Sequence, residues 1–155
     1  MDELFGWIEA SSVGRTVAGS LMLTASLSAV HVLGFTLATG GALVANLSRL
    51  GLVFAQRPVP QTTGPAGRIM LLGLAISIVT GALLFSARAA SAAANGIFQI
   101  KMLLLVAAVT FHFAAQRWAD ARPRNSAKLA AAAGALSLTL WTALAVAACA
   151  FILLE

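Results

Sequence analysis

Four long apolar stretches follow one another along the chain, separated by short polar segments. No Asp, Glu, Lys or Arg occurs in 16–48, 69–87 or 129–154, and a fourth apolar stretch lies between Lys101 and Arg117. About 20 apolar residues are enough for a helix to cross a bilayer. The pattern therefore predicts four membrane-spanning helices, over 17–47, 67–87, 97–119 and 128–153.

The segments between these stretches contain residues that end helices. Pro58 and Pro60 follow the first stretch, Asn95-Gly96 opens the third, and Pro123 separates the third from the fourth. Because short connections place consecutive helices antiparallel, we expect an all-α integral membrane four-helix up-down bundle. The bundle is a single transmembrane domain over 1–155.

The N-terminal residues predict a short helix lying in the membrane interface. Leu4, Trp7 and Ile8 share one helical face, with acidic residues on the other, so an interfacial helix is expected over 3–13. Acidic residues also stand where a secretory signal would carry positive charge. We therefore expect no secretory signal here, and a frayed tail is the alternative to the interfacial helix.

Composition agrees with the hydrophobic pattern. The 155 residues are 60% hydrophobic and only 10% charged, whereas soluble domains have about 45–50% and about 25%. Seven of the ten basic residues lie in 48–68 and 117–128. In the predicted up-down bundle these two segments lie on the opposite side of the membrane from both termini. The positive-inside rule then predicts both termini outside the membrane that holds the protein, which we expect to be a bacterial inner (cytoplasmic) membrane. Its basic loops face lipid headgroups of the bilayer, and no nucleic-acid partner is expected.

Two histidines are the main candidates for chemistry. Along with the thiol of Cys149, His31 and His112 are the only ionisable groups deep in the predicted spans, and such groups are functional candidates by default. They lie 14 and 15 residues from the predicted outer ends of their helices, so we expect both imidazoles at nearly one depth. Imidazole is an established axial ligand of haem iron. The leading hypothesis is one b-type haem with both histidines as its metal ligands.

Residues around the histidines fit a flat cofactor. Gly34, one turn from His31, leaves room beside a macrocycle, and Lys101, three turns before His112, is expected to reach a haem propionate. Small and polar residues recur at three- and four-residue steps in the first span: Ser20, Thr24, Ser28, His31, Gly34, Ala38, Gly41 and Ala45. This hypothesis describes a cytochrome-like electron-transfer subunit that exchanges electrons with quinone or with a redox partner protein.

The same residues also fit two other functions. Small-residue stripes also let membrane helices pack closely without a cofactor, so the chain could be a non-catalytic anchor or assembly subunit of a larger complex, or a homo-oligomer. Copper handling is the other alternative, since Met and Cys select Cu(I), although Met22 and Met102 lie off the helical faces of the histidines. No phosphate loop, nucleophile elbow or zinc-protease motif occurs. We do not expect an enzyme acting on its own.

Several short motifs follow one another in order along the chain. They are Trp7-Ile8-Glu9-Ala10-Ser11, His31-Val32-Leu33-Gly34, Thr80-Gly81-Ala82-Leu83-Leu84-Phe85, Asn95-Gly96-Ile97-Phe98-Gln99-Ile100-Lys101, Phe111-His112 and Leu136-Ser137-Leu138-Thr139-Leu140-Trp141. With these motifs the chain resembles an uncharacterised family of small four-helix bacterial integral membrane proteins over nearly its whole length. The Thr-Gly pair and Lys101 are also similar, more distantly, to the membrane domain of copper-resistance D-type proteins. In departures from the family's pattern, Ser28 replaces an acidic residue and Cys149 an arginine. The resemblance implies the four-helix fold and no settled activity.

Overall fold

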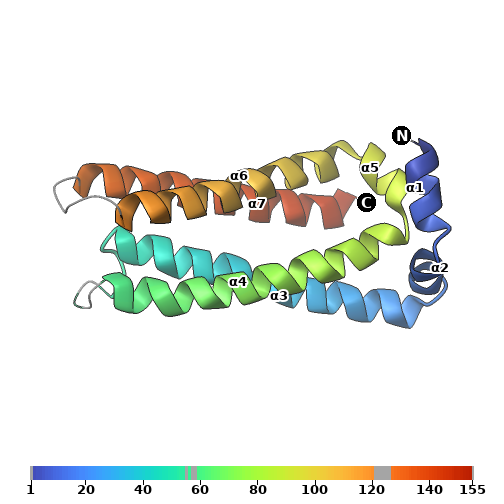
Figure 1. The fold of residues 1–155 in the computed structure, drawn as a ribbon, viewed down its shortest axis with the longest axis horizontal. Coiled ribbons are helices and arrows are strands. Elements are labelled where there is room, and N and C mark those ends of the chain that lie inside the picture. The colour runs from blue at the N-terminus through green and yellow to red at the C-terminus, as the bar shows by residue number, and fades with distance from the viewer. Residues whose placement is uncertain (1, 55, 57–58, 121–126, 155) are drawn as a thin grey trace.

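The computed structural model describes residues 2–54, 56, 59–120 and 127–154, and over these residues all regular structure is helical. Figure 1 shows the helices, which are α1 (Asp2–Glu9), α2 (Ser12–Ala18), α3 (Leu21–Arg49), α4 (Val59–Ser86), α5 (Ala89–Ala94), α6 (Gly96–Asp120) and α7 (Ala127–Leu154). By length and composition α3, α4, α6 and α7 can each cross a membrane. They run alternately in opposite directions, so the predicted four-helix membrane fold is confirmed.

The N-terminal segment forms two helices where the sequence predicts one over 3–13. The break lies at Ser11, whose hydroxyl accepts a hydrogen bond from the Gly14 N–H at 3.1 Å and so caps α2. Ser20 caps α3 in the same way, by accepting from the Leu23 N–H at 3.3 Å. The first membrane helix therefore begins at Leu21 and not at residue 17.

Other helix boundaries also differ from the prediction. α4 begins at Val59, eight residues before the predicted start, and Pro65 lies inside it although prolines were expected to end the preceding crossing. Pro65 lacks the N–H of one helical hydrogen bond, a loss that a helix can absorb near its beginning. The short α5 was not predicted, and the Glu9 carboxylate accepts from its Ala90 N–H at 2.9 Å.

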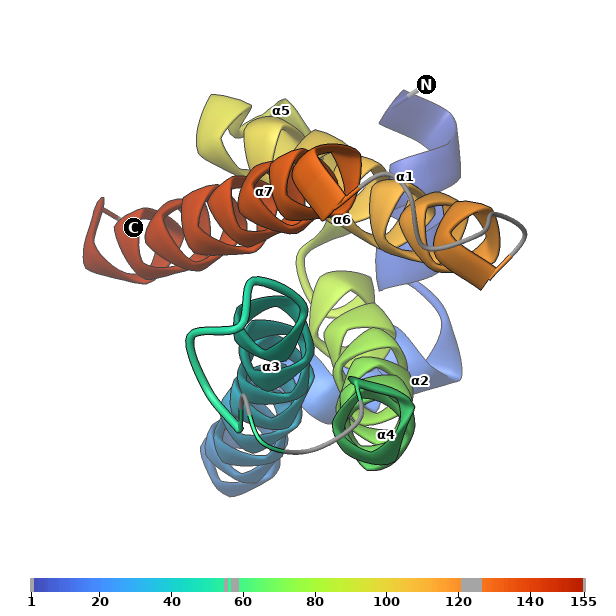
Figure 2. The same ribbon diagram turned by 90° about the vertical axis from the view of Figure 1, so that its left-hand side faces the viewer.

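The four long helices form two antiparallel hairpins, α3–α4 and α6–α7. Seen from the end, the α6–α7 hairpin lies across the α3–α4 hairpin, and among the described residues α3 and α7 make the main helix contact between the hairpins (Figure 2). The helices α1, α2 and α5 gather at one end of the bundle, here named the capped end (Figure 1). The opposite end is here named the basic end, because α3 ends there at Arg49 and α6 carries Arg117 in its last turn there.

Glycines bring α3 and α4 unusually close together. A Cβ added at Gly41 would lie 2.6 Å from the Ala66 carbonyl oxygen and 2.7 Å from the Met70 nitrogen. A Cβ added at Gly73 would collide with the backbone of Gly34 and Ala38. Small residues allow this approach in membranes, where van der Waals contact and not water exclusion drives helix association.

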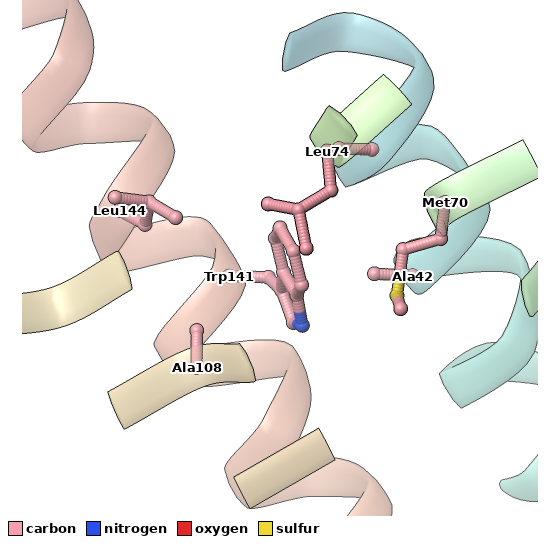
Figure 3. Close-up of a cluster of buried hydrophobic side chains, with 7 residues drawn as sticks. Ala42, Met70, Leu74, Ala108, Trp141 and Leu144 are labelled. Atoms are coloured by element: carbon pink, nitrogen blue, oxygen red, sulfur yellow. The ribbon is translucent and has the colours of Figure 1, made fainter. Parts of the chain in front are cut away.

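The hairpins share a small hydrophobic core around Trp141. Its indole projects from α7 between Met70 and Leu74 of α4 on one side and Ala108 of α6 on the other (Figure 3). Only 2% of Trp141 and 1% of Met70 is exposed. The core therefore holds the two hairpins in a fixed relation about halfway along the bundle.

Candidate functional site

His31 lies on α3 where this helix meets α4. Its Nδ1 is 3.1 Å from the Thr80 hydroxyl oxygen, and its backbone oxygen accepts from the Ser77 hydroxyl at 3.3 Å. The ring lies against Gly81, where an added Cβ would come within 2.9 Å of the imidazole Cε1. α4 thus holds the half-buried ring through the Thr80 hydroxyl and a glycine-sized gap, while the Ser77 hydroxyl holds the backbone of α3.

The bond to Thr80 determines which nitrogen of His31 carries the proton. The Thr80 hydroxyl donates its own proton to the Ile76 carbonyl oxygen at 2.7 Å, so towards His31 it acts as an acceptor. Nδ1 therefore donates, and Nε2 keeps its lone pair. The Ser77 backbone carbonyl of α4 is a second hydrogen-bond partner of the imidazole. A histidine whose Nδ1 is oriented in this way can offer Nε2 to a metal.

Lys101 of α6 lies on the same side of the molecule as His31. It is close enough for its charge to act on the imidazole. Its Nζ lies 5.2 Å from the centroid of the Phe151 ring, a cation–π contact. Phe151 packs on Phe98, which stacks on Phe85 at 5.6 Å. Aromatic rings from α4, α6 and α7 thus join the helices near the capped end.

His112 occupies a different part of the bundle. It is fully buried, and its ring meets the edges of Trp141 at 6.3 Å and Phe113 at 6.0 Å between centroids. The charge of Arg49, at the end of α3, acts on it. His112 is therefore part of the core in the half of the bundle nearer the basic end.

The structure does not bring the two imidazoles together. His112 packs on Trp141, whose core cluster includes Ala42 of α3, and Ala42 lies eleven residues, or about 16 Å of helix, beyond His31. The prediction of equal depth is wrong because it counted residues along each helix separately, from 17 and 97, whereas α3 and α6 are staggered along the bundle.

A layer of uncharged polar groups connects the hairpins near His112. The Asn46 side-chain amide donates to the Ser137 hydroxyl at 3.0 Å, joining α3 to α7, and the Arg49 guanidinium donates to the Asn46 carbonyl oxygen at 3.4 Å. Asn46 and Ser137 are 0% and 1% exposed. The indole N–H of Trp141 is also buried, and the described residues give it no hydrogen-bond partner.

The sequence reasoning missed this layer because it considered only ionisable groups. Asn46 and Ser137 are uncharged, yet each lies inside an apolar stretch where lipid offers no hydrogen-bond partner. An asparagine in such a position predicts a polar contact to another helix. That signal was present in the sequence.

The small-residue stripe of α3 faces α4. A Cβ added at Gly34 would lie 2.9 Å from the Ser77 hydroxyl oxygen and 3.0 Å from the Gly73 carbonyl oxygen. Ala38 is likewise buried in this contact. The space beside Gly34 is thus filled by α4, and the stripe serves helix packing.

The soft candidate ligands are spread over the bundle. Met22 is 79% exposed, Met70 is buried in the core, and Cys149 is exposed on α7. Among residues 2–54, 56, 59–120 and 127–154, no three His, Cys, Asp or Glu side chains gather as a metal-binding group.

Four helices that are long and apolar enough to cross a membrane define a small multi-pass membrane protein. Residues 4–151 match the model of a family of unknown function, DUF6644, and the chain belongs to that family. The predicted membership of an uncharacterised family is confirmed in this form. No curated protein and no solved structure matches the chain, so the similarity to copper-resistance D-type proteins stays a prediction.

Proposed function

We propose that this protein is a membrane-embedded electron-transfer subunit that binds one b-type haem, with His31 as an axial ligand. One observation carries the proposal: Nδ1 of His31 lies 3.1 Å from a Thr80 hydroxyl that donates to the Ile76 carbonyl oxygen, and the tautomer we assign from this pair offers Nε2 to a ligand. Haem supplies one-electron chemistry, and neutral imidazole is among its usual axial ligands.

Neighbouring residues support haem at this position. Gly81 leaves room for the His31 ring on the α4 side, so the ring is held without side-chain bulk. Lys101 supplies a positive charge near His31, as a propionate requires. The Thr80 hydroxyl orients the ring and raises the basicity of Nε2, which is the usual task of a hydrogen-bond partner behind a metal ligand.

The proposal assigns His31 alone. His112 was predicted as the second ligand, but Trp141 and Phe113 pack against it, about 16 Å along the helices from the level of His31. Residues that would hold one haem together have to lie close to each other, which His31 and His112 do not. In this arrangement of helices His112 is a core residue.

The proposed orientation places His31 in the outer half of a bacterial inner membrane. The positive-inside rule puts the basic end in the cytoplasm, so α1 and the end of α7 lie outside. His31 is nearer the capped end, which suits electron exchange with quinone in the bilayer or with a protein on the outer surface.

The test is a haem titration of the purified full-length protein in detergent. We expect a saturable change in the Soret absorbance with one haem per chain, and a spectral shift on dithionite reduction. If wild-type protein shows no saturable change at micromolar haem, the electron-transfer proposal is wrong. An anchor subunit predicts that result.

A second candidate function is a non-catalytic anchor or assembly subunit. Its support is the packing of Gly34, Ala38 and Gly41 against α4, which shows that the stripe needs no cofactor. This function predicts that the protein co-purifies with a larger complex and that His31→Ala leaves the complex intact. Copper handling, the other alternative, gains no support from the positions of the methionines and Cys149.

A further inference from the structure

A groove runs along the outside of the α3–α4 hairpin towards the basic end. It has a volume of about 390 Å³ and is lined by Leu37, Gly40 and Val44 of α3, by Ile69 of α4, and by Phe54 of the connecting segment, among others. Leu37, Ile69 and Phe54 are 41%, 48% and 53% exposed, so the walls are open to the surroundings. The groove is therefore apolar along most of its length.

Gly40 leaves open space in the groove. A Cβ added at this residue would meet nothing within 4 Å, whereas the adjacent Gly41 touches the α4 backbone. The α3 residues that line the groove, from Thr36 to Val44, cover about 12 Å of helix. A single flexible hydrocarbon chain has the shape and polarity that such a groove accommodates.

Polar groups replace apolar ones where the groove reaches the basic end. Gln61 and Thr62, in the first turn of α4, line this part, and within the described chain their side chains make no hydrogen bond. Helix N–H groups in a first turn also lack helical acceptors. Phe54, on the other side, has a φ of 52°, a left-handed conformation that costs a non-glycine residue energy. The mouth of the groove thus combines hydrogen-bond donors with a strained aromatic residue.

Arg68 supplies positive charge on the same helix, outside the residues that line the groove. It lies seven residues, or about 10 Å, after Gln61, so the two side chains share one side of α4. Arg68 is exposed and forms no ion pair with the residues that the structure describes. A long arginine side chain in a membrane helix extends towards the nearer headgroup layer.

From the groove and this charge we infer a binding site for one anionic phospholipid. An acyl chain lies in the groove over Gly40, and the headgroup phosphate meets Gln61, Thr62 and the Arg68 guanidinium. Charge complementarity favours a lipid over an apolar partner helix, which would leave the donors at the mouth without acceptors. The inference does not depend on haem, since His31 lies on the other half of α3.

The test is native mass spectrometry of the full-length protein released from detergent with added lipid. The probes are phosphatidylglycerol and phosphatidylcholine with identical acyl chains. We expect one phosphatidylglycerol to bind about fivefold more tightly than phosphatidylcholine, the difference that one arginine near a headgroup supplies. Equal binding of the two lipids would overturn the inference.

Three variants separate the headgroup contact from the acyl-chain contact. Arg68→Gln should abolish the preference for phosphatidylglycerol while binding of phosphatidylcholine stays the same. Gly40→Leu fills the groove and should weaken both lipids at least fivefold. Ala29→Leu is the control, because Ala29 is an exposed α3 residue away from the groove. If Arg68→Gln keeps the preference, or if Ala29→Leu weakens binding as much as Gly40→Leu, the site is wrongly placed.

Discussion

The closest contact between α3 and α4 predicts different effects for the same substitution at two adjacent glycines. Gly41→Ala places a Cβ at 2.6 Å from the Ala66 carbonyl oxygen and 2.7 Å from the Met70 nitrogen. Both atoms belong to the α4 backbone, so no side chain can rotate away. Gly40→Ala places the same methyl group where nothing lies within 4 Å.

The pair of variants isolates the cost of separating the helices. Alanine raises helix propensity at both positions by up to about 1 kcal/mol relative to glycine, and this gain cancels in the comparison. Overpacking a closed contact costs about 1–3 kcal/mol. We therefore expect Gly41→Ala to be less stable than Gly40→Ala by about 1–3 kcal/mol.

The difference in free energy of unfolding is measured by unfolding both variants with dodecyl sulfate in mixed micelles. Trp141 lies between the hairpins, so its fluorescence reports the loss of the core as the helices separate. Circular dichroism at the start of each titration checks that both variants are helical. Equal free energies of unfolding for the two variants would refute the close α3–α4 contact, and so would a more stable Gly41→Ala.

Three further predictions concern the polar contacts. Asn46→Ala and Ser137→Ala should each lower the free energy of unfolding by about 1–3 kcal/mol, since each leaves a buried polar group without its partner. The double variant should lose less than the sum of the two single variants. Additive losses would contradict the 3.0 Å hydrogen bond. Trp141→Phe should change the free energy of unfolding by under about 1.5 kcal/mol, because the indole N–H makes no hydrogen bond with the described residues. Trp141→Ala should cost about 3–5 kcal/mol. Equal losses for the two variants would show that the indole N–H has a hydrogen-bond partner. Thr80→Val should weaken haem binding about 10–100-fold in the Soret titration, because it removes the hydrogen-bond acceptor beside Nδ1 of His31. Thr80→Ser should keep the wild-type haem affinity. Unchanged haem affinity in Thr80→Val would contradict the role of Thr80 in orienting His31.

Much of the fold follows from the distribution of charge along the sequence. Long uncharged stretches predict membrane helices because each unsatisfied peptide group costs several kcal/mol in lipid. The predicted ranges 97–119 and 128–153 differ from α6 and α7 by one residue at each end. The larger errors concern where two helices begin. The Ser20 side chain caps α3, which therefore begins at Leu21. Pro65 lies inside α4, which begins before it at Val59.

The candidate site was predictable only in part. The importance of His31 is visible in the sequence, but its partner Thr80 lies 49 residues away and becomes relevant only when the α3–α4 register is known. The pairing with His112 fails for the same reason, since depth counted along single helices ignores how two hairpins are staggered. The contact between Asn46 and Ser137 spans 91 residues and depends on that stagger too.

The most direct test of the account compares haem binding by His31→Ala and His112→Ala. The two histidines lie at different depths, with His31 oriented through Nδ1 by Thr80 and His112 enclosed by the core. Soret titration of both purified variants should show haem binding lost in His31→Ala and retained in His112→Ala with unchanged stoichiometry. Circular dichroism confirms that both variants are folded. Binding retained in His31→Ala, or lost in a folded His112→Ala, would contradict the account.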